Sequence, residues 1–210
     1  AVTSFANSVA EKAKGADGTL GTDDDVNHRI AVVGFASGNP SNTLYYNSEV
    51  FVGSNQYQYN TTASDHYSEA LQSMNTTQGK DNITASINAL DAEGATFTNL
   101  GMEMANGVLD ANPVQTGEKR NRVIIVFTDG VPGRTDWDST VANNAINQAQ
   151  TAKDNGVTVY TVGVFSGADA TSAGSSSGTD TQKANWFMQN LSSNNGKVQT
   201  PSYYLPAADA

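Results

Sequence analysis

Apolar residues follow two alternating patterns along the chain, one typical of helices and one typical of buried strands. They recur at helical spacing in 2–14, and they run almost unbroken in 28–37 (HRIAVVGFAS) and 121–130 (NRVIIVFTDG), as in strands covered on both faces. The same patterns predict further helices and strands, the helices at 64–74, 80–91, 98–112, 138–155 and around Trp186, and the strands at 44–53, 157–165 and 197–204. This alternation predicts an α/β fold, a doubly wound and mostly parallel sheet with helices on both faces.

Three polar stretches interrupt this pattern and are predicted as loops. Residues 15–27 are rich in Gly and Asp, residues 54–63 form an inserted surface loop, and residues 167–180 form a flexible, low-complexity insertion. The whole chain, 1–210, is predicted to be one domain. Because residue 1 already stands in a helical pattern, we expect a piece of a longer protein, with any signal or anchor outside it. No apolar run reaches the length of a membrane span.

Composition excludes several classes of function. A net charge of −10 with eleven scattered basic residues does not provide the positive surface that nucleic acid requires. The absence of cysteine excludes disulfides, thiolate metal sites and cysteine nucleophiles. Asn, Thr, Ser and Gly are abundant while charged residues reach only 15%, which favours a surface or secreted protein.

Asp129 is the first candidate for chemistry, because it directly follows the apolar run VIIVF. Ligands of open parallel sheets collect at the carboxyl ends of the strands, and Gly130 lets the backbone turn sharply there. Thr96 and Thr98 precede a predicted helix, so one hydroxyl can cap the helix while the other faces solvent or a ligand. A turn aspartate and a plain helix cap are the alternatives that the sequence leaves open.

The segments GATFTNLGMEMA (94–105) and RVIIVFTDG (122–130) together resemble the von Willebrand factor type A family. The apolar runs at 28–37 and 157–165 and the final KVQTPSYYLP (197–206) are also similar to strands of that family, so the resemblance covers nearly the whole chain. It implies a Rossmann-like fold and a role in adhesion. It also implies a metal-ion-dependent adhesion site, at which the family binds protein partners.

The resemblance assigns roles to individual residues. Thr96 would offer its hydroxyl to Mg²⁺ or Mn²⁺, and Asp129 would coordinate the ion directly or through water. The partner would be a protein or an extracellular-matrix ligand that supplies an acidic side chain. The rim that meets this partner would include four residues, Thr98, Gly130, Arg134 and Asp136.

The chain departs from the family at one motif. The family carries D-x-S-x-S at the end of its first strand, just before the first helix, whereas this chain begins within that helix and contains the motif nowhere. We therefore expect the metal site to be only partly present and to bind metal weakly or not at all by itself. The sheet would lack its central strand, and the strand edges left open would invite pairing with another chain.

The acidic loop offers a second possible metal site. Asp17, Asp23, Asp24 and Asp25 could bind Ca²⁺ through carboxylate and backbone oxygens, although the loop lacks the EF-hand spacing. A solvated acidic loop is the alternative.

Enzyme motifs are missing from the sequence. It contains no G-x-S-x-G elbow and no phosphate-binding loop, and His28 and His66 stand apart from any evident nucleophile. A phosphatase that used Asp129 as nucleophile would need a second acid at position 131, which is Val131. We therefore predict a binding module and not an enzyme.

The sequence favours an adhesion module of a bacterial surface or secreted protein. Two other readings of the family resemblance stay open. One is a structural type A domain without adhesive function. The other is an intracellular type A domain that serves an ATPase-driven, chelatase-like complex.

Overall fold

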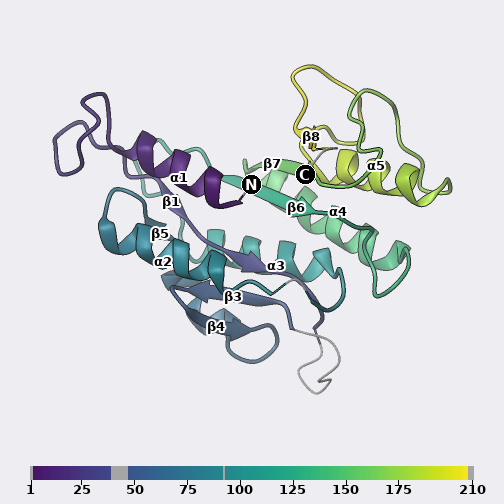
Figure 1. Ribbon diagram of the computed structural model, residues 1–210, viewed down its shortest axis with the longest axis horizontal. Coiled ribbons are helices and arrows are strands. Elements are labelled where there is room, and N and C mark those ends of the chain that lie inside the picture. The colour runs from purple at the N-terminus through teal and green to yellow at the C-terminus, as the bar shows by residue number, and fades with distance from the viewer. Residues whose placement is uncertain (1, 39–46, 92, 208–210) are drawn as a thin grey trace.

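The computed structural model describes residues 2–38, 47–91 and 93–207, which form an α/β fold (Figure 1). Its helices are α1 (Val2–Ala13), α2 (Thr77–Asn88), α3 (Thr98–Asp110), α4 (Ser139–Asp154), α5 (Asp180–Leu191) and the short 3₁₀ helix η1 (Ala63–Glu69). Its strands are β1 (Arg29–Ile30), β2 (Val33–Gly34), β3 (Glu49–Val52), β4 (Asn55–Gln58), β5 (Gln72–Ser73), β6 (Val123–Thr128), β7 (Thr158–Gly163) and β8 (Tyr204–Pro206).

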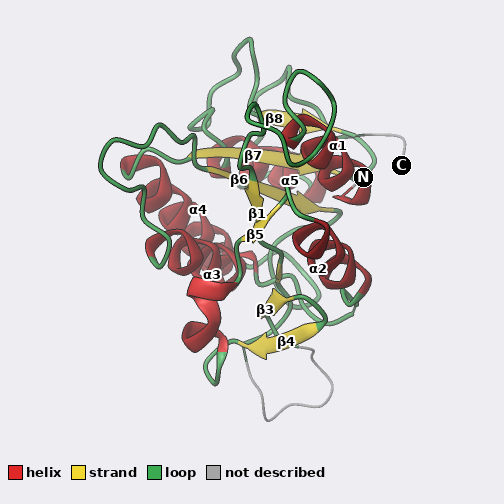
Figure 2. Cartoon of the chain, turned by 90° about the vertical axis from the view of Figure 1, so that its left-hand side faces the viewer, coloured by secondary structure: helices red, strands yellow, loops and turns green. Residues whose placement is uncertain are grey.

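The sheet β6-β7-β8 is parallel throughout, with β7 in the middle. Helices α3 and α4 lie on one side of the strands and α1 and α2 on the other (Figure 2). This arrangement confirms the predicted α/β class with helices on both faces of the sheet. The parallel register sends the carboxyl ends of β6 and β7 to the same edge, with Thr128 opposite Gly163.

The strands before α3 pair differently. β2-β3-β4 form an antiparallel sheet and β1-β5 an antiparallel pair, so the parallel pairing is concentrated after residue 122. Within the part of the chain that the structure describes, no backbone hydrogen bond joins residues 29–37 to residues 121–130. β6 is therefore an edge strand of its sheet.

The largest core cluster explains why β6 and β7 hold their places. Ile124 and Val126 of β6 and Val159 of β7 are buried, while Ile125 and Phe127 on the opposite face of β6 are half-buried. Alternating burial of this kind is typical of a strand with one face against the main core. Side chains of α4 and α5 complete the cluster, among them Ala142, Ala145, Ala149, Ala152, Phe187, Met188 and Leu191.

The structure corrects the predictions for the region between 54 and 74. Residues 55–58 are polar and show no period, yet they form β4, which pairs with β3 in a hairpin. The helix predicted at 64–74 is instead η1 followed by β5. The strand predicted at 44–53 is described only from residue 47, and it begins at Glu49.

Two predictions near the end of the chain also need correction. Residues 167–180 lack regular structure as expected, but α5 holds them in place. Asn185 Nδ2 donates to the Gly167 carbonyl over 2.9 Å, and Gln189 Nε2 donates to the Ser172 carbonyl over 2.6 Å. The last strand is also shorter than predicted, because β8 begins only at Tyr204 and residues 197–203 are not in a strand.

Among the described residues, no helix combines the length and the apolar character that crossing a membrane requires.

Candidate functional site

The carboxyl edge of the sheet brings together three segments that are distant in sequence. The Phe97 amide donates to the Ala36 carbonyl over 3.0 Å, which attaches the loop before α3 to the segment after β2. Thr96 and Gly133 exchange backbone hydrogen bonds of 2.7 and 3.1 Å, which attach the same loop to the segment after β6. Thr96 is therefore fixed on both sides at the edge where β6 ends.

Gly133 makes this attachment possible. Its φ of +142° lies in a region that residues with a side chain rarely adopt. A Cβ at this position would also collide with the carbonyl oxygen of Asp136. The backbone at 133 can approach both Thr96 and the following turn only because the residue is glycine.

Thr96 and Asp129, the two predicted metal ligands, lie at the same edge. A Cβ built on Gly130 would stand 3.9 Å from Thr96 Oγ1, so the residue after Asp129 faces the Thr96 hydroxyl. Thr128 Oγ1 lies 3.3 Å from both the Gly130 amide and the Gly130 carbonyl, which holds the turn that presents Asp129. Asp129 is exposed, and no described residue forms a hydrogen bond or ion pair with it.

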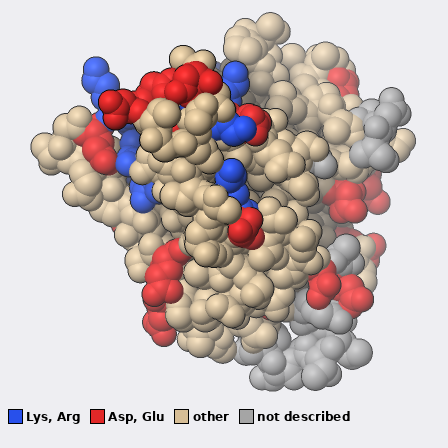
Figure 3. Space-filling model, turned by 60° about the vertical axis from the view of Figure 1, so that its left-hand side comes forward, with Lys and Arg blue, Asp and Glu red and all other residues tan. Residues whose placement is uncertain are grey.

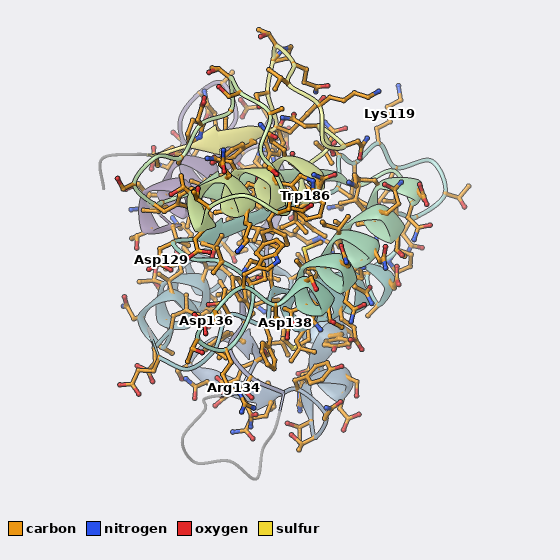
Figure 4. The ribbon with its side chains drawn as sticks, turned by 90° about the vertical axis from the view of Figure 1, so that its right-hand side faces the viewer. Lys119, Asp129, Arg134, Asp136, Asp138 and Trp186 are labelled. Atoms are coloured by element: carbon orange, nitrogen blue, oxygen red, sulfur yellow. The ribbon has the colours of Figure 1, made fainter. Side chains whose placement is uncertain are left out.

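Three of the four predicted rim residues are accessible at this edge. Arg134 and Asp136 are exposed and Gly130 is half-buried, and Figure 4 shows Arg134 and Asp136 on the segment that follows Asp129. Thr98 does not lie on the surface, contrary to expectation. It is 1% exposed because it forms the first turn of α3 against the core. Phe97, and not a threonine, holds the N-cap position of α3, and Thr98 Oγ1 has no hydrogen-bond partner among the described residues.

Aromatic packing and a helix cap hold the rim segment 131–138. The Trp137 ring packs edge-on against Trp186 and Phe187, with ring centroids 6.0 and 6.4 Å apart. Asp138 Oδ1 accepts hydrogen bonds from the amides of Thr140 and Val141, which caps α4. Trp137 was not among the predicted site residues, although an apolar residue just before a capping aspartate often anchors the start of a helix.

A pocket of about 380 Å³ adjoins the rim, and most of its lining was not predicted from the sequence. Ser37, Tyr59, Phe97, Asn99 and Arg134 are among the residues around it. Ser37 follows an apolar run just as Asp129 does, and this position is the signal that could have found it. Burial and a 2.8 Å hydrogen bond to Glu103 raise the pKa of the Tyr59 hydroxyl to about 12, so Tyr59 presents a neutral hydroxyl near neutral pH.

The oxygen donors at the edge are suited in type to Mg²⁺ or Mn²⁺, but they are few. Thr96 offers a hydroxyl and Asp129 a carboxylate, both hard donors that these ions prefer. No group of three or more His, Asp or Glu side chains converges anywhere in residues 2–38, 47–91 and 93–207. Thr96 and Asp129 alone would supply only part of a coordination sphere, and a metal at this edge stays a prediction.

The acidic loop uses its carboxylates internally. Asp24 Oδ2 accepts from the amides of Ala16 and Asp17 over 2.6 and 3.2 Å. Asp25 Oδ2 accepts from the Gly21 amide over 2.8 Å. A hydrogen bond from the Thr22 hydroxyl and those from the two amides lower the pKa of Asp24. These contacts organise the loop, and Ca²⁺ binding by Asp17, Asp23, Asp24 and Asp25 stays a prediction.

Comparisons with known proteins agree with this architecture. A family model described as von Willebrand factor type A domain matches residues 48–201. Among solved structures, the pilus adhesin SpaC from Lactobacillus rhamnosus GG is similar, with a TM-score of 0.57 and 16% identity. The similarity covers 99% of this chain and 25% of SpaC, so the chain spans about a quarter of that protein. No curated protein matches the chain.

Proposed function

The chain belongs to the von Willebrand factor type A family, and from that premise we propose that it is a protein-binding module for adhesion. Its contact surface is the carboxyl edge of the sheet, with Thr96 and Asp129 at the centre and Gly130, Arg134 and Asp136 on the rim. The module binds its partner and catalyses no reaction. The similarity to a pilus adhesin supports a place at the bacterial cell surface or outside the cell.

The observation that carries this proposal is the convergence of Thr96 and Asp129. They come from different loops, yet backbone hydrogen bonds of 2.7 and 3.1 Å between Thr96 and Gly133 draw those loops together. Both side chains are accessible, and Asp129 has no described partner inside the chain. An exposed carboxylate beside a fixed hydroxyl is available to something outside the chain.

We further propose that Thr96 and Asp129 contribute two ligands to a Mg²⁺ or Mn²⁺ site. When bound, such an ion supplies a positive charge and open coordination positions to which a carboxylate of the partner can bind. Thr96 holds its hydroxyl in place through its backbone bonds to Gly133, and Asp129 offsets part of the charge. The D-x-S-x-S motif is absent from these residues, so further ligands are needed to complete the site.

Calorimetric titration with MnCl₂ tests the metal proposal. Asp129→Ala is expected to weaken Mn²⁺ binding by about tenfold or more, because affinity at oxygen sites depends on the number of charged ligands. Thr96→Ala is expected to weaken binding less, and Thr96→Ser to restore it. Asp81→Asn, an exposed carboxylate on α2, changes the net charge equally and is the matched control. Equal affinity in the Asp129→Ala variant would refute the assignment.

A partner-binding assay in the presence of a chelator distinguishes an adhesive domain from a purely structural one. If the proposal is right, partner binding is lost in EDTA and returns with Mn²⁺. Binding that persists in EDTA would favour the type A domain that only spaces or stiffens a larger protein.

A further inference from the structure

A second pocket, of about 450 Å³, lies at the opposite end of the sheet, where β6 begins. It is lined by the end of α3, the turn after α4 and the segment that leads into β6, including Leu109, Asp110, Pro113, Val114, Arg120 and Arg122. The six residues of β6 span about 20 Å. Lys119, next to Arg120, accordingly lies far from Asp129 in Figure 4.

Arg122 is the unusual residue of this pocket. Its side chain is 19% exposed, and its Nε atom is buried without a hydrogen-bond partner among the described residues. Its contact with a carboxylate is long, 3.9 Å from Nη2 to Asp110 Oδ1, and the Asp110 side chain is 70% exposed. A guanidinium is always charged and carries five donors, so burying it without acceptors is costly.

Arg120, in the same segment, differs from Arg122 because its guanidinium is hydrogen-bonded within the chain. Its Nε and Nη2 donate to the Glu118 carboxylate over 3.0 and 3.1 Å. Its Nη1 reaches the Asn27 carbonyl at 3.5 Å, and the hydrogen bonds from Arg120 and the Gln115 amide lower the pKa of Glu118. Arg120 is thus held at the wall of the pocket, whereas no described residue forms a hydrogen bond with the guanidinium of Arg122.

Helix ends account for the presence of a positive charge here but not for its lack of acceptors. α3 ends at Asp110 and α4 at Asp154, and the partial negative charge at helix C-termini favours a nearby cation. A purely structural arginine in this place would donate to the last carbonyls of a helix. No hydrogen bond from Arg122 reaches any described carbonyl.

We propose that this pocket binds a carboxylate of an acidic peptide segment from a partner protein, and that Arg122 is the residue that contacts this carboxylate. A carboxylate matches the planar fork of a guanidinium, and hydrogen bonds from the Nη atoms of Arg122 would give them the close acceptor that the 3.9 Å contact with Asp110 does not provide. Leu109, Pro113 and Val114 add an apolar wall, and Val114 is 37% exposed. This wall fits an aliphatic side chain next to the acidic residue.

The net charge of the chain makes this recognition short-range. On the face shown in Figure 3, Lys and Arg side chains lie among Asp and Glu side chains and form no unbroken basic surface. A chain with a net charge of −10 repels anions at long range, so binding depends on short-range hydrogen bonds inside the pocket. The site does not depend on the metal edge, and either proposal can fail without the other.

The experiment is an NMR titration of the whole chain with the dipeptide N-acetyl-leucyl-glutamate amide. We expect amide shifts at Leu109, Val114 and Gly156. Arg122→Met is expected to weaken binding by about tenfold or more, as for loss of a charge-assisted hydrogen bond. Lys119→Met removes the same charge from an exposed neighbour and is expected to leave binding unchanged. Arg120→Met is expected to weaken binding less than Arg122→Met.

Three results would overturn the proposal. The first is equal binding of the glutamine dipeptide, which would remove the role of the carboxylate. The second is binding of inorganic phosphate as tight as that of the glutamate dipeptide, which would indicate a general anion site without peptide recognition. The third is unchanged affinity in Arg122→Met, with a thermal midpoint that shows the variant is folded.

Discussion

The two ends of β6 carry charged side chains in different surroundings. At the carboxyl end, Asp129 is exposed and water can solvate it. At the start, Arg122 is 19% exposed, with a buried Nε that has no acceptor among the described residues. The first arrangement costs almost no stability. The second costs more, because Arg122 is partly desolvated and only a long, 3.9 Å contact with the exposed Asp110 carboxylate offsets this.

Because of this difference, the two residues are unequal as evidence for a bound ligand. An exposed aspartate alone does not indicate a ligand, so the role of Asp129 depends on Thr96 beside it and on the type A family. Arg122 supports a ligand more directly, because its side chain is only 19% exposed, its one ion pair is 3.9 Å long and its buried Nε has no acceptor among the described residues. Substitutions at the two ends should therefore change the free energy of unfolding by different amounts and in different directions.

The largest effect is expected from Gly133→Ala. The φ of +142° is unfavourable for alanine, and the added Cβ collides with the Asp136 carbonyl. We expect the free energy of unfolding to fall by about 1–3 kcal/mol from backbone strain alone. Because Gly133 also holds Thr96, Mn²⁺ binding should weaken in the same variant. Urea denaturation and calorimetry measure the two effects, and a stable variant with full metal affinity would contradict the account.

Asp138→Ala is expected to have an intermediate effect at the same end. It removes the N-cap of α4, whose Oδ1 accepts from the Thr140 and Val141 amides over 2.8 and 3.2 Å. The free energy of unfolding should fall by about 1 kcal/mol. Asp138→Asn, which keeps a capping oxygen, should recover most of it in the same urea titration. Equal loss in both variants would show that the cap is not the cause.

Arg122→Met should act in the opposite direction. The substitution removes a half-buried charge whose one ion pair is long and exposed, and it keeps an apolar chain. The free energy of unfolding should therefore stay unchanged or rise by up to about 1 kcal/mol. Asp129→Ala should change it by less than about 0.5 kcal/mol, because the side chain is exposed. Thermal unfolding of the two variants side by side measures this contrast. A strongly destabilised Arg122→Met would mean that the chain itself satisfies this arginine.

The smallest expected effect is the alkaline titration of Tyr59. Its folded-state pKa of about 12 lies above the usual 10.0, because of burial and the hydrogen bond to Glu103. The unfolded chain therefore loses this proton first, so stability is complete below pH 10 and declines as pH rises from 10 to about 12. Comparing the ultraviolet titration of the wild-type chain with that of Tyr59→Phe isolates the one hydroxyl. Ionisation near pH 10 would show that Tyr59 is not shielded.

The sequence predicted the elements whose pattern is local. The run at 123–128 and the period of 138–155 depend on residues close in sequence, and both elements form as expected. β4 was missed because its residues, Asn55–Gln58, are polar. These residues form a strand because they pair with Glu49–Val52 across the turn at Gly53. The spacing of apolar residues does not reveal such pairing.

The site was predictable in part for the same reason. Thr96 and Asp129 stand in recognisable motifs, whereas the burial of Thr98 depends on how α3 packs, with Gly101 close against Phe35. No sequence pattern singles out Arg122, because an arginine just before a strand is usually solvated. Its partial burial follows from the meeting of α3, α4 and β6, which no local pattern encodes.

The measurement that tests the central claim most directly is Mn²⁺ paramagnetic broadening in the NMR spectrum of the whole chain. We expect the amides of Thr96 and Gly130 to broaden first, and we expect Asp129→Ala, but not Asp81→Asn, to abolish this broadening. Broadening confined to residues 16–25, or unchanged in Asp129→Ala, would contradict a metal-dependent binding site at the carboxyl edge of the sheet.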